Sequence, residues 1–102
     1  MIARVWRGRT LPENADAYQQ LLATTILPGI DRVQGFRGAD LFRRDVGGEV
    51  EFMTITRFES LDAVREFAGE DYERAVVSEE AHRLLSSFDE RVAIYELPLE
   101  EV

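Results

Sequence analysis

The sequence contains no cysteine among its 102 residues, and its one histidine is His82. Without cysteine the chain forms no disulfide, holds no metal through thiolates and has no thiol nucleophile. A lone histidine is a weak basis for a metal site, because such sites combine several histidine, cysteine or carboxylate ligands. No glycine-rich phosphate loop follows a strand-like segment either. We therefore expect no metal, flavin or other cofactor.

A long apolar run is also missing from the N-terminal region. In the first ten residues, MIARVWRGRT, the apolar positions are interrupted by Arg4, Arg7 and Arg9. A signal peptide or a membrane-spanning helix needs a continuous apolar segment. We therefore expect a cytoplasmic protein without a membrane partner.

Basic charge is scarce relative to acidic charge. Twelve Lys and Arg residues stand against 20 Asp and Glu residues, which gives a net charge of -8 at pH 7. Phosphate backbones repel such a chain, and no basic stripe offsets the repulsion. We expect no nucleic-acid partner.

The sequence does contain enough apolar surface for one core. Hydrophobic residues make up 45% of the chain and aromatic residues 10%, while the charged 31% is spread along its length. A chain of this size supports a single core and is too short for two. We predict one folded domain over residues 1–102, with Glu100 and Glu101 as a charged tail.

The first half of the chain has the patterns of a strand, a helix and a hairpin. Residues 2–7 are rich in β-branched and aromatic types, which are typical of a strand. Apolar residues then recur at helical spacing after Asn14, which we expect to cap a helix ending near Pro28. Two strand-like runs, 35–45 and 49–59, are joined by a Gly-Gly pair that suits a tight hairpin turn.

The second half predicts two helices and a last strand. Ser60 is expected to cap a helix that stops at Gly69, and an irregular segment follows. Ser78 is expected to cap a short helix whose apolar stripe continues to Phe88. Residues 89–99 have the pattern of a closing strand.

The resulting order, β-α-β-β-α-β, predicts an α+β, ferredoxin-like fold with an antiparallel sheet and helices on one face. Side chains alternate across a strand, yet both alternating sets are apolar here. Examples are Phe52 on one side, with Met53 and Ile55 on the other. A second apolar face in a small protein usually marks an interface, so we predict a homodimer formed through the sheet.

Several segments resemble one known family. They are VWRG at 5–8, DAYQQLL and LPGI in the first helix, GADLFRRDVGGEVEF, SLDAVREFAGEDYERAVV and FDERVAIYEL. In these segments the sequence resembles the antibiotic biosynthesis monooxygenase superfamily, and within it a bacterial branch. Members of that superfamily are ferredoxin-like subunits that pair into a dimeric α/β barrel, so the resemblance implies this assembly.

The resemblance implies two alternative chemistries. Some members oxidise phenolic polyketides to quinones without metal or flavin, whereas others bind haem and open its ring. The haem-degrading members use an Asn on the first strand with a Trp and a His near the last strand. Here the first strand has no Asn, Phe67 stands where the Trp is expected, and only His82 matches.

Three residues are candidates for catalysis: Arg4, Tyr72 and His82. His82 is a pocket base, or else a surface residue paired with Glu79 one turn earlier. Tyr72 either points into a cavity or covers a loop. Arg4, if buried, needs an anionic ligand or a carboxylate partner such as Glu51 or Glu96.

Three aromatic residues are candidates for substrate binding: Trp6, Phe52 and Phe67. Each is equally suited to filling the core. We predict a cofactor-independent monooxygenase-like protein that acts on a small aromatic or quinol-type molecule in an apolar pocket of each subunit. The alternatives are a non-catalytic homodimer with a ligand-binding or stress-related role and, more distantly, a haem-degrading monooxygenase.

Overall fold

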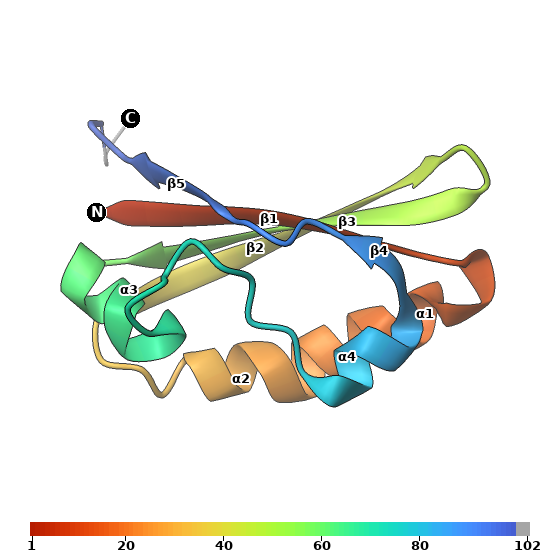
Figure 1. The fold of residues 1–102 in the computed structure, drawn as a ribbon, viewed down its shortest axis with the longest axis horizontal. Helices are drawn as coiled ribbons and strands as arrows, with labels where there is room; N and C mark the ends of the chain where they lie inside the picture. The colour runs from red at the N-terminus through yellow and green to blue at the C-terminus, as the bar shows by residue number, and fades with distance from the viewer. Residues whose placement is uncertain (100–102) are drawn as a thin grey trace.

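The computed structural model describes residues 1–99, and the expected Glu100–Glu101 tail lies outside that range. An antiparallel sheet of five strands forms one layer, and all helices cover one of its faces (Figure 1). The elements follow in the order β1 (Ile2–Thr10), α1 (Pro12–Leu21), a π-helical segment (Leu22–Ile26), α2 (Leu27–Ile30), β2 (Phe36–Val46), β3 (Glu49–Phe58), α3 (Leu61–Ala68), α4 (Glu79–Leu84), β4 (Leu85–Phe88) and β5 (Ala93–Glu96). None of the helices within residues 1–99 is long and apolar enough to cross a membrane.

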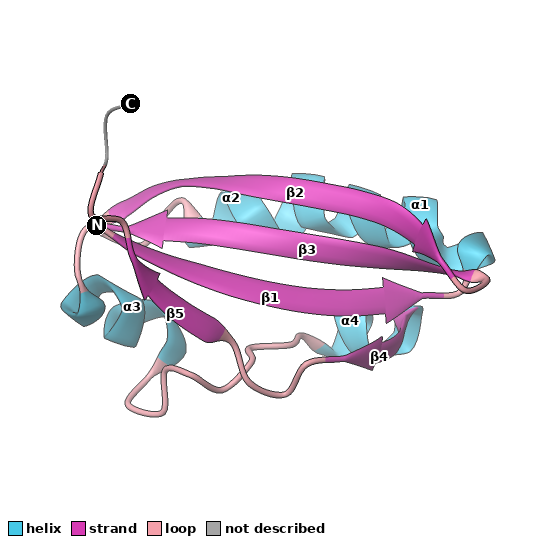
Figure 2. Cartoon of the chain, turned by 90° about the horizontal axis from the view of Figure 1, so that it is seen from above, coloured by secondary structure: helices cyan, strands magenta, loops and turns pink. Residues whose placement is uncertain are grey.

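The strand order is β2-β3-β1-β4, with β5 also paired to β1 (Figure 2). All neighbours in the sheet are antiparallel. The ferredoxin-like α+β fold is therefore confirmed. The closing strand expected over 89–99 is present but shorter, as β5, and a further short strand, β4, precedes it in the stretch expected to be helical.

The helix expected to continue past Ser78 to Phe88 ends earlier, at Leu84. Leu85 already has an extended backbone, and Phe88 lies opposite Gly8 in the ladder between β4 and β1. The Phe88 ring also packs against Trp6, with 5.9 Å between ring centroids. Sheet pairing and this aromatic contact outweigh the helical spacing of the apolar residues, which is a weaker local preference.

The first helix differs from the prediction at both ends. Asn14 is not its cap: the helix begins at Pro12, and the Asn14 N–H donates to the Leu11 carbonyl at 3.0 Å. Proline suits a first helical position because the missing N–H would have no helical partner there. At the other end the helical path continues beyond Pro28 to Ile30.

The π-helical segment lets the chain pass Pro28 without a break. In a regular helix the proline ring would clash with the carbonyl four residues earlier. Here the Leu27 N–H donates to the Leu22 carbonyl, five residues back, which widens the turn just before the proline. Such π turns are rare and are often found at functional sites.

The remaining turn and cap predictions are confirmed. Gly47 and Gly48 have φ of 56° and 83°, the positive values that the β2–β3 hairpin turn requires. The hydroxyls of Ser60 and Ser78 each accept the backbone N–H three residues on, so both cap their helices. Gly69 ends α3 with a φ of 86°.

The helix-covered face of the sheet carries two core clusters. The first consists of Ala15, Tyr18, Leu22, Val50, Phe52 and Ala81. The second consists of Ile30, Phe58, Ala63 and Val64. Ile26, in the π-helical segment, packs against both clusters.

The opposite face of the sheet has no helix over it (Figure 1). By strand register and alternation it presents Ala3, Val5, Phe42, Met53, Ile55 and Tyr95. Phe42 is 49% exposed and Tyr95 58% exposed. We call this surface the open face.

Candidate functional site

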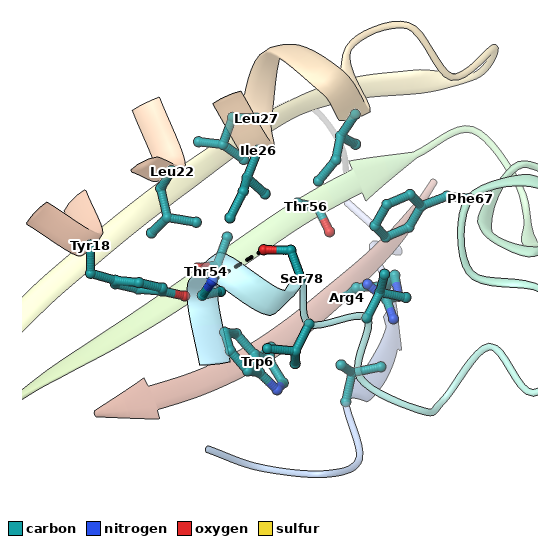
Figure 3. Close-up of a pocket in the computed structure, with 15 residues that line it drawn as sticks. Arg4, Trp6, Tyr18, Leu22, Ile26, Leu27, Thr54, Thr56, Phe67 and Ser78 are labelled. Carbon is teal, nitrogen blue, oxygen red and sulfur yellow. Dashed lines mark hydrogen bonds between the residues drawn. The ribbon is translucent and has the colours of Figure 1, made fainter. Parts of the chain in front are cut away.

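A cavity lies between the sheet and the helices, where the two core clusters meet (Figure 3). Strands β1 and β3 form its floor, and residues from α1, the π-helical segment and α2 form one wall. Residues 69–78, which we call the covering segment, contribute Val76, Val77 and Ser78. The polar part of the lining is Arg4, Tyr18, Thr54, Thr56 and Ser78, and the rest is apolar or aromatic.

Arg4 is the charged group of this lining. It is only 6% exposed, and no carboxylate forms an ion pair with it among residues 1–99. Its Nη2 donates to the carbonyls of Tyr72 and Arg74 at 3.3 and 3.4 Å, while its Nε is buried without a partner. The guanidinium also lies over the Phe67 ring, 5.2 Å from its centroid.

The expectation that Glu51 or Glu96 neutralises Arg4 is wrong. Glu51 lies on the open face, where it pairs with Arg9 and Arg44 at 3.3 and 3.1 Å. Side chains alternate across β3, so Glu51 points away from the helices while the next residue, Phe52, points towards them. Arg4 is therefore a buried cation whose charge no carboxylate of the described chain balances.

Burial lowers the pKa of Arg4 from its ordinary value to about 10. The guanidinium still carries its charge at neutral pH, but in an environment that disfavours it. A buried charge is stabilised when an opposite charge is brought to it. An anionic group entering the cavity would supply that charge.

Tyr18 is a polar cavity residue that the sequence analysis missed. It is 1% exposed, and its ring meets Phe52 edge-on at a centroid distance of 4.9 Å. In Figure 3 its hydroxyl points into the cavity, and no residue among 1–99 bonds to it. Burial raises its pKa above the ordinary value of 10, so the phenol stays protonated. The sequence already placed Tyr18 in the apolar stripe of this helix. A tyrosine buried among aliphatic residues needs a hydrogen-bond partner for its hydroxyl, and this was the available signal.

Two threonines on β3 add hydroxyls to the floor. Thr54 and Thr56 are 9% and 5% exposed, and the Thr54 Oγ1 is buried without a partner. They lie opposite Trp6 and Arg4 in the β1–β3 ladder. Threonine at two successive core-facing positions of β3, after Phe52, was the sequence signal for this polar floor.

Two of the aromatic candidates line the cavity. Trp6 forms part of the floor, and its Nε1 donates to the Asp89 carbonyl at 2.6 Å. Phe67 stacks on Phe58 at 5.9 Å and lies under the Arg4 guanidinium. Phe52 is fully buried beside the cavity and supports the Tyr18 ring rather than lining the space.

Tyr72 and His82 do not line this cavity. The Tyr72 ring packs against the second core cluster with the Arg65 guanidinium over it, and its carbonyl is what reaches Arg4. His82 is exposed, and its ring meets Phe88 edge-on at 5.0 Å.

His82 borders a separate polar hollow with Arg74, Glu90 and Arg91. Its expected partner Glu79 instead lies 3.6 Å from Arg83 on the same helix. Both residues of that pair are largely exposed, so it contributes little to stability. His82 is thus without the carboxylate partner that the sequence suggested.

The space inside the cavity is about 70 Å³. An engineered cavity of about 150 Å³ in another protein binds benzene, so a single aromatic ring needs more room than this. The covering segment has no helix or strand, and it is tied to residues 90–92 and to Arg4. The Ala75 N–H donates to the Glu90 carbonyl at 2.8 Å, the Val92 N–H donates to the Glu73 carbonyl at 2.7 Å, and Arg91 pairs with Asp71 at 2.7 Å. An outward movement of the segment would break such bonds and would give the additional space.

The arrangement suits binding and polarising an anionic oxygen. A cation and neutral hydroxyl donors face a mostly apolar space that is partly shielded from solvent, where electrostatic interactions are stronger than in water. No group of three or more possible metal ligands occurs within residues 1–99. The fold and the cavity together are those of a monooxygenase-like or ligand-binding subunit.

Residues 1–79 match the antibiotic biosynthesis monooxygenase family. The chain therefore belongs to this family, which confirms the resemblance seen in the sequence. A search among curated proteins found no match.

Solved structures with the same fold include proteins from two bacteria. Rv0793 of Mycobacterium tuberculosis shares 27% identity over 98% of this chain and 96% of its own, with a TM-score of 0.61. A Bacillus cereus protein assigned to antibiotic biosynthesis monooxygenases shares 14% over 100% and 95%, with a TM-score of 0.66. The heme-degrader MhuD of M. tuberculosis, with two hemes bound in its active site, shares 16% over 100% of both chains, with a TM-score of 0.63. At 14% and 16% identity the last two support the fold alone.

The residues around the cavity do not fit haem. A haem iron needs an axial ligand such as histidine, yet His82 lies outside the Arg4 cavity, across Val77. The cavity volume of about 70 Å³ is also far below the roughly 300–1,000 Å³ of pockets for drug-sized ligands. No step of the chemistry below passes through haem.

Proposed function

We propose that the protein is a cofactor-independent monooxygenase-like enzyme that binds a small phenol or quinol in the Arg4 cavity. The observation that carries this proposal is the buried guanidinium of Arg4, which faces the cavity without a carboxylate partner. A phenol that loses its proton supplies the missing negative charge. Trp6 and Phe67 supply the aromatic surface of the cavity lining that the ring would contact.

The first step under this proposal is ionisation of the phenol. An opposite charge within a few ångströms favours the ionised form, so Arg4 lowers the pKa of the bound phenol. The proton leaves to water as the ligand enters, since the cavity lining has no carboxylate or histidine to take it. Under this proposal His82 is not the base that the sequence suggested, because it does not line the cavity.

The second step is reaction of the phenolate ring carbon with molecular oxygen. One oxygen atom forms a new ring C=O bond, and the other leaves as water with the hydrogens of the broken C–H and O–H bonds. The substrate supplies all four electrons, so no external reductant is needed. Arg4 stabilises the oxyanion in the transition state, which is usually the largest single contribution of such a site.

We also propose that two subunits pair through the open face. This face carries apolar side chains on neighbouring strands with no helix over them among residues 1–99, and a contiguous apolar surface of this kind often marks an interface. Its rim holds ion pairs, including Arg57–Asp40 at 2.6 Å and the Glu51 pairs. A second copy would cover the apolar centre and leave the helix-side cavity of each subunit free.

The second candidate function is ligand binding without catalysis. The observation that favours it is the small volume of the cavity, which has no room for a ring until the covering segment moves. A binding protein would use the same Arg4 charge to hold a small anion without consuming oxygen.

Oxygen uptake by the purified protein separates the two functions. A panel of phenols and quinols is added to the protein after dialysis against a metal chelator, and dissolved oxygen is followed with an electrode. The enzyme hypothesis predicts substrate-dependent uptake with quinone formation above the spontaneous rate. Binding of panel members without any uptake would leave only the binding function.

A further inference from the structure

The hydroxyl of Tyr18 has no role in the chemistry proposed above. Buried tyrosine hydroxyls usually have a hydrogen-bond partner. At 1% exposure Tyr18 has none among residues 1–99, although its hydroxyl faces the cavity (Figure 3). On the floor below, the Thr54 Oγ1 is buried and also has no partner. Two unpartnered hydroxyls thus belong to one part of the cavity.

This hydroxyl pair and Arg4 belong to different ends of the cavity. Tyr18 packs against Phe52 in the first core cluster, whereas Arg4 lies over Phe67, which packs against the second cluster. On the floor Thr54 and Thr56 are two residues apart, roughly 7 Å along the strand. Arg4 lies opposite Thr56, whereas Tyr18 packs on Phe52, at the end of the cavity nearer Thr54. The distance between these two ends of the cavity is about the length of one substituted aromatic ring.

We propose that Tyr18 is a second anchor for the ligand, and that the ligand is an aromatic molecule with an anionic oxygen at one end and an uncharged acceptor oxygen, such as a carbonyl, at the other. Arg4 binds the anionic oxygen, and the Tyr18 hydroxyl donates a hydrogen bond to the acceptor. This inference rests on the proposed function, because it uses the same cavity and the same Arg4 anchor.

The ends cannot be exchanged without loss. Only the guanidinium balances a negative charge, and charge-assisted hydrogen bonds are about twice as strong as neutral ones. Tyr18 is held protonated, since burial disfavours its phenolate, and so it acts as a donor. A ligand without an acceptor oxygen would leave this hydroxyl unpaired in an apolar wall. The site should therefore select against such ligands.

The test compares two phenols of similar shape in the parent protein and in Tyr18→Phe. 4-Hydroxybenzaldehyde carries the carbonyl acceptor, whereas 4-methylphenol does not. Both are blocked at the ring position opposite the hydroxyl, so binding is measured apart from turnover there. Tyr95→Phe is the matched control, because Tyr95 is an exposed tyrosine of the open face. Dissociation constants come from calorimetric titration, and the phenolate absorption band reports the charge of the bound ligand.

We expect Tyr18→Phe to weaken 4-hydroxybenzaldehyde about 5-fold, the equivalent of one hydrogen bond, while its phenolate band persists. The affinity of Tyr18→Phe for 4-methylphenol should stay within about 2-fold of the parent value, because this ligand accepts no hydrogen bond from Tyr18. Tyr95→Phe should change neither. An equal loss of affinity for both ligands would mean that Tyr18 only supports the fold, and the proposal would fail. An unchanged affinity of Tyr18→Phe for 4-hydroxybenzaldehyde would overturn it too. So would the absence of any binding by the parent protein.

The outcome is independent of catalysis. If Tyr18-dependent binding is found but no phenol or quinol is oxidised, the ligand class stands and the monooxygenase function fails. If oxygen is consumed but Tyr18→Phe affects both ligands alike, the function stands and the second anchor fails.

Discussion

Arg4 and Tyr18 face one cavity from opposite layers of the fold, Arg4 from the central strand β1 and Tyr18 from helix α1. Neither has a charged partner there, and each is almost completely buried. A buried guanidinium without a carboxylate and a buried hydroxyl without a hydrogen-bond partner both lower the stability of the folded protein. We interpret the loss as the consequence of a site shaped for a ligand.

Replacing Arg4 by Met should therefore not destabilise the protein. Burial lowers the pKa of Arg4 to about 10, which corresponds to about 3 kcal/mol against the charged form. The two long hydrogen bonds from its Nη2 to the carbonyls of Tyr72 and Arg74, at 3.3 and 3.4 Å, offset only part of this cost. We expect the free energy of unfolding of Arg4→Met, from urea denaturation, to equal that of the parent or exceed it by up to about 2 kcal/mol. A loss of about 2 kcal/mol would instead indicate a structural role.

Interruption of the open face should abolish the homodimer. Ile55→Glu places a charge at its apolar centre, opposite Val5. Sedimentation is expected to give twice the chain mass for the parent and the single-chain mass for this variant. Ala17→Glu, on an exposed position of α1, is the control and should remain dimeric. A folded parent that sediments as a monomer at micromolar concentration would rule out the predicted dimer.

Glu51 should make stability depend on pH in the acid range. The hydrogen bond from Arg44 and the attraction of Arg44 and Arg9 hold the pKa of Glu51 below its ordinary value of 4.5, against the effect of burial. The folded state therefore binds the proton less readily than the unfolded state, and the stabilisation is present above pH 4.5 and lost as the pH falls through the folded pKa. At fixed protein concentration, the parent should exceed Glu51→Gln in unfolding free energy at pH 7, and the difference should shrink as the pH is lowered below 4.5. A difference that is constant over this range would mean that the charge is not involved.

His82→Ala should leave the binding of small phenols unchanged, because the side chain borders the neighbouring hollow and not the Arg4 cavity. Loss of the edge contact with Phe88 should lower the free energy of unfolding by no more than about 1 kcal/mol. Haem titration followed in the Soret band should also give the same result for parent and variant. A saturable haem complex that only the parent forms would return haem chemistry to consideration.

The fold was predictable because its signals are local. The Gly47–Gly48 turn and the Ser60 and Ser78 caps each depend on a few neighbouring residues, and all are present in the structure. The end of α4 was not predictable in this way. Phe88 has helical spacing in the sequence, but its pairing with Gly8 is a contact across the chain that no local pattern contains.

The candidate site was predictable only in part. Arg4, Trp6 and Phe67 are brought together as cavity residues, since two lie on the same face of β1 and the third on the helix stripe above it. Tyr18 was missed because its apolar neighbours make it look like a core residue. Whether a buried hydroxyl has a partner depends on packing in three dimensions, and that information is absent from residue spacing.

The most direct test of the account is the effect of Arg4 on oxygen consumption. With the best phenol or quinol of the panel, kcat/KM is measured for the parent, for Arg4→Met and for Arg4→Lys, which keeps a positive charge. Loss of one oxyanion-stabilising group lowers the rate by roughly 100- to 1,000-fold, so we expect a decrease of this order for Arg4→Met and a smaller one for Arg4→Lys. Equal kcat/KM in parent and Arg4→Met, or no oxygen uptake by the parent with any member of the panel, would contradict the account.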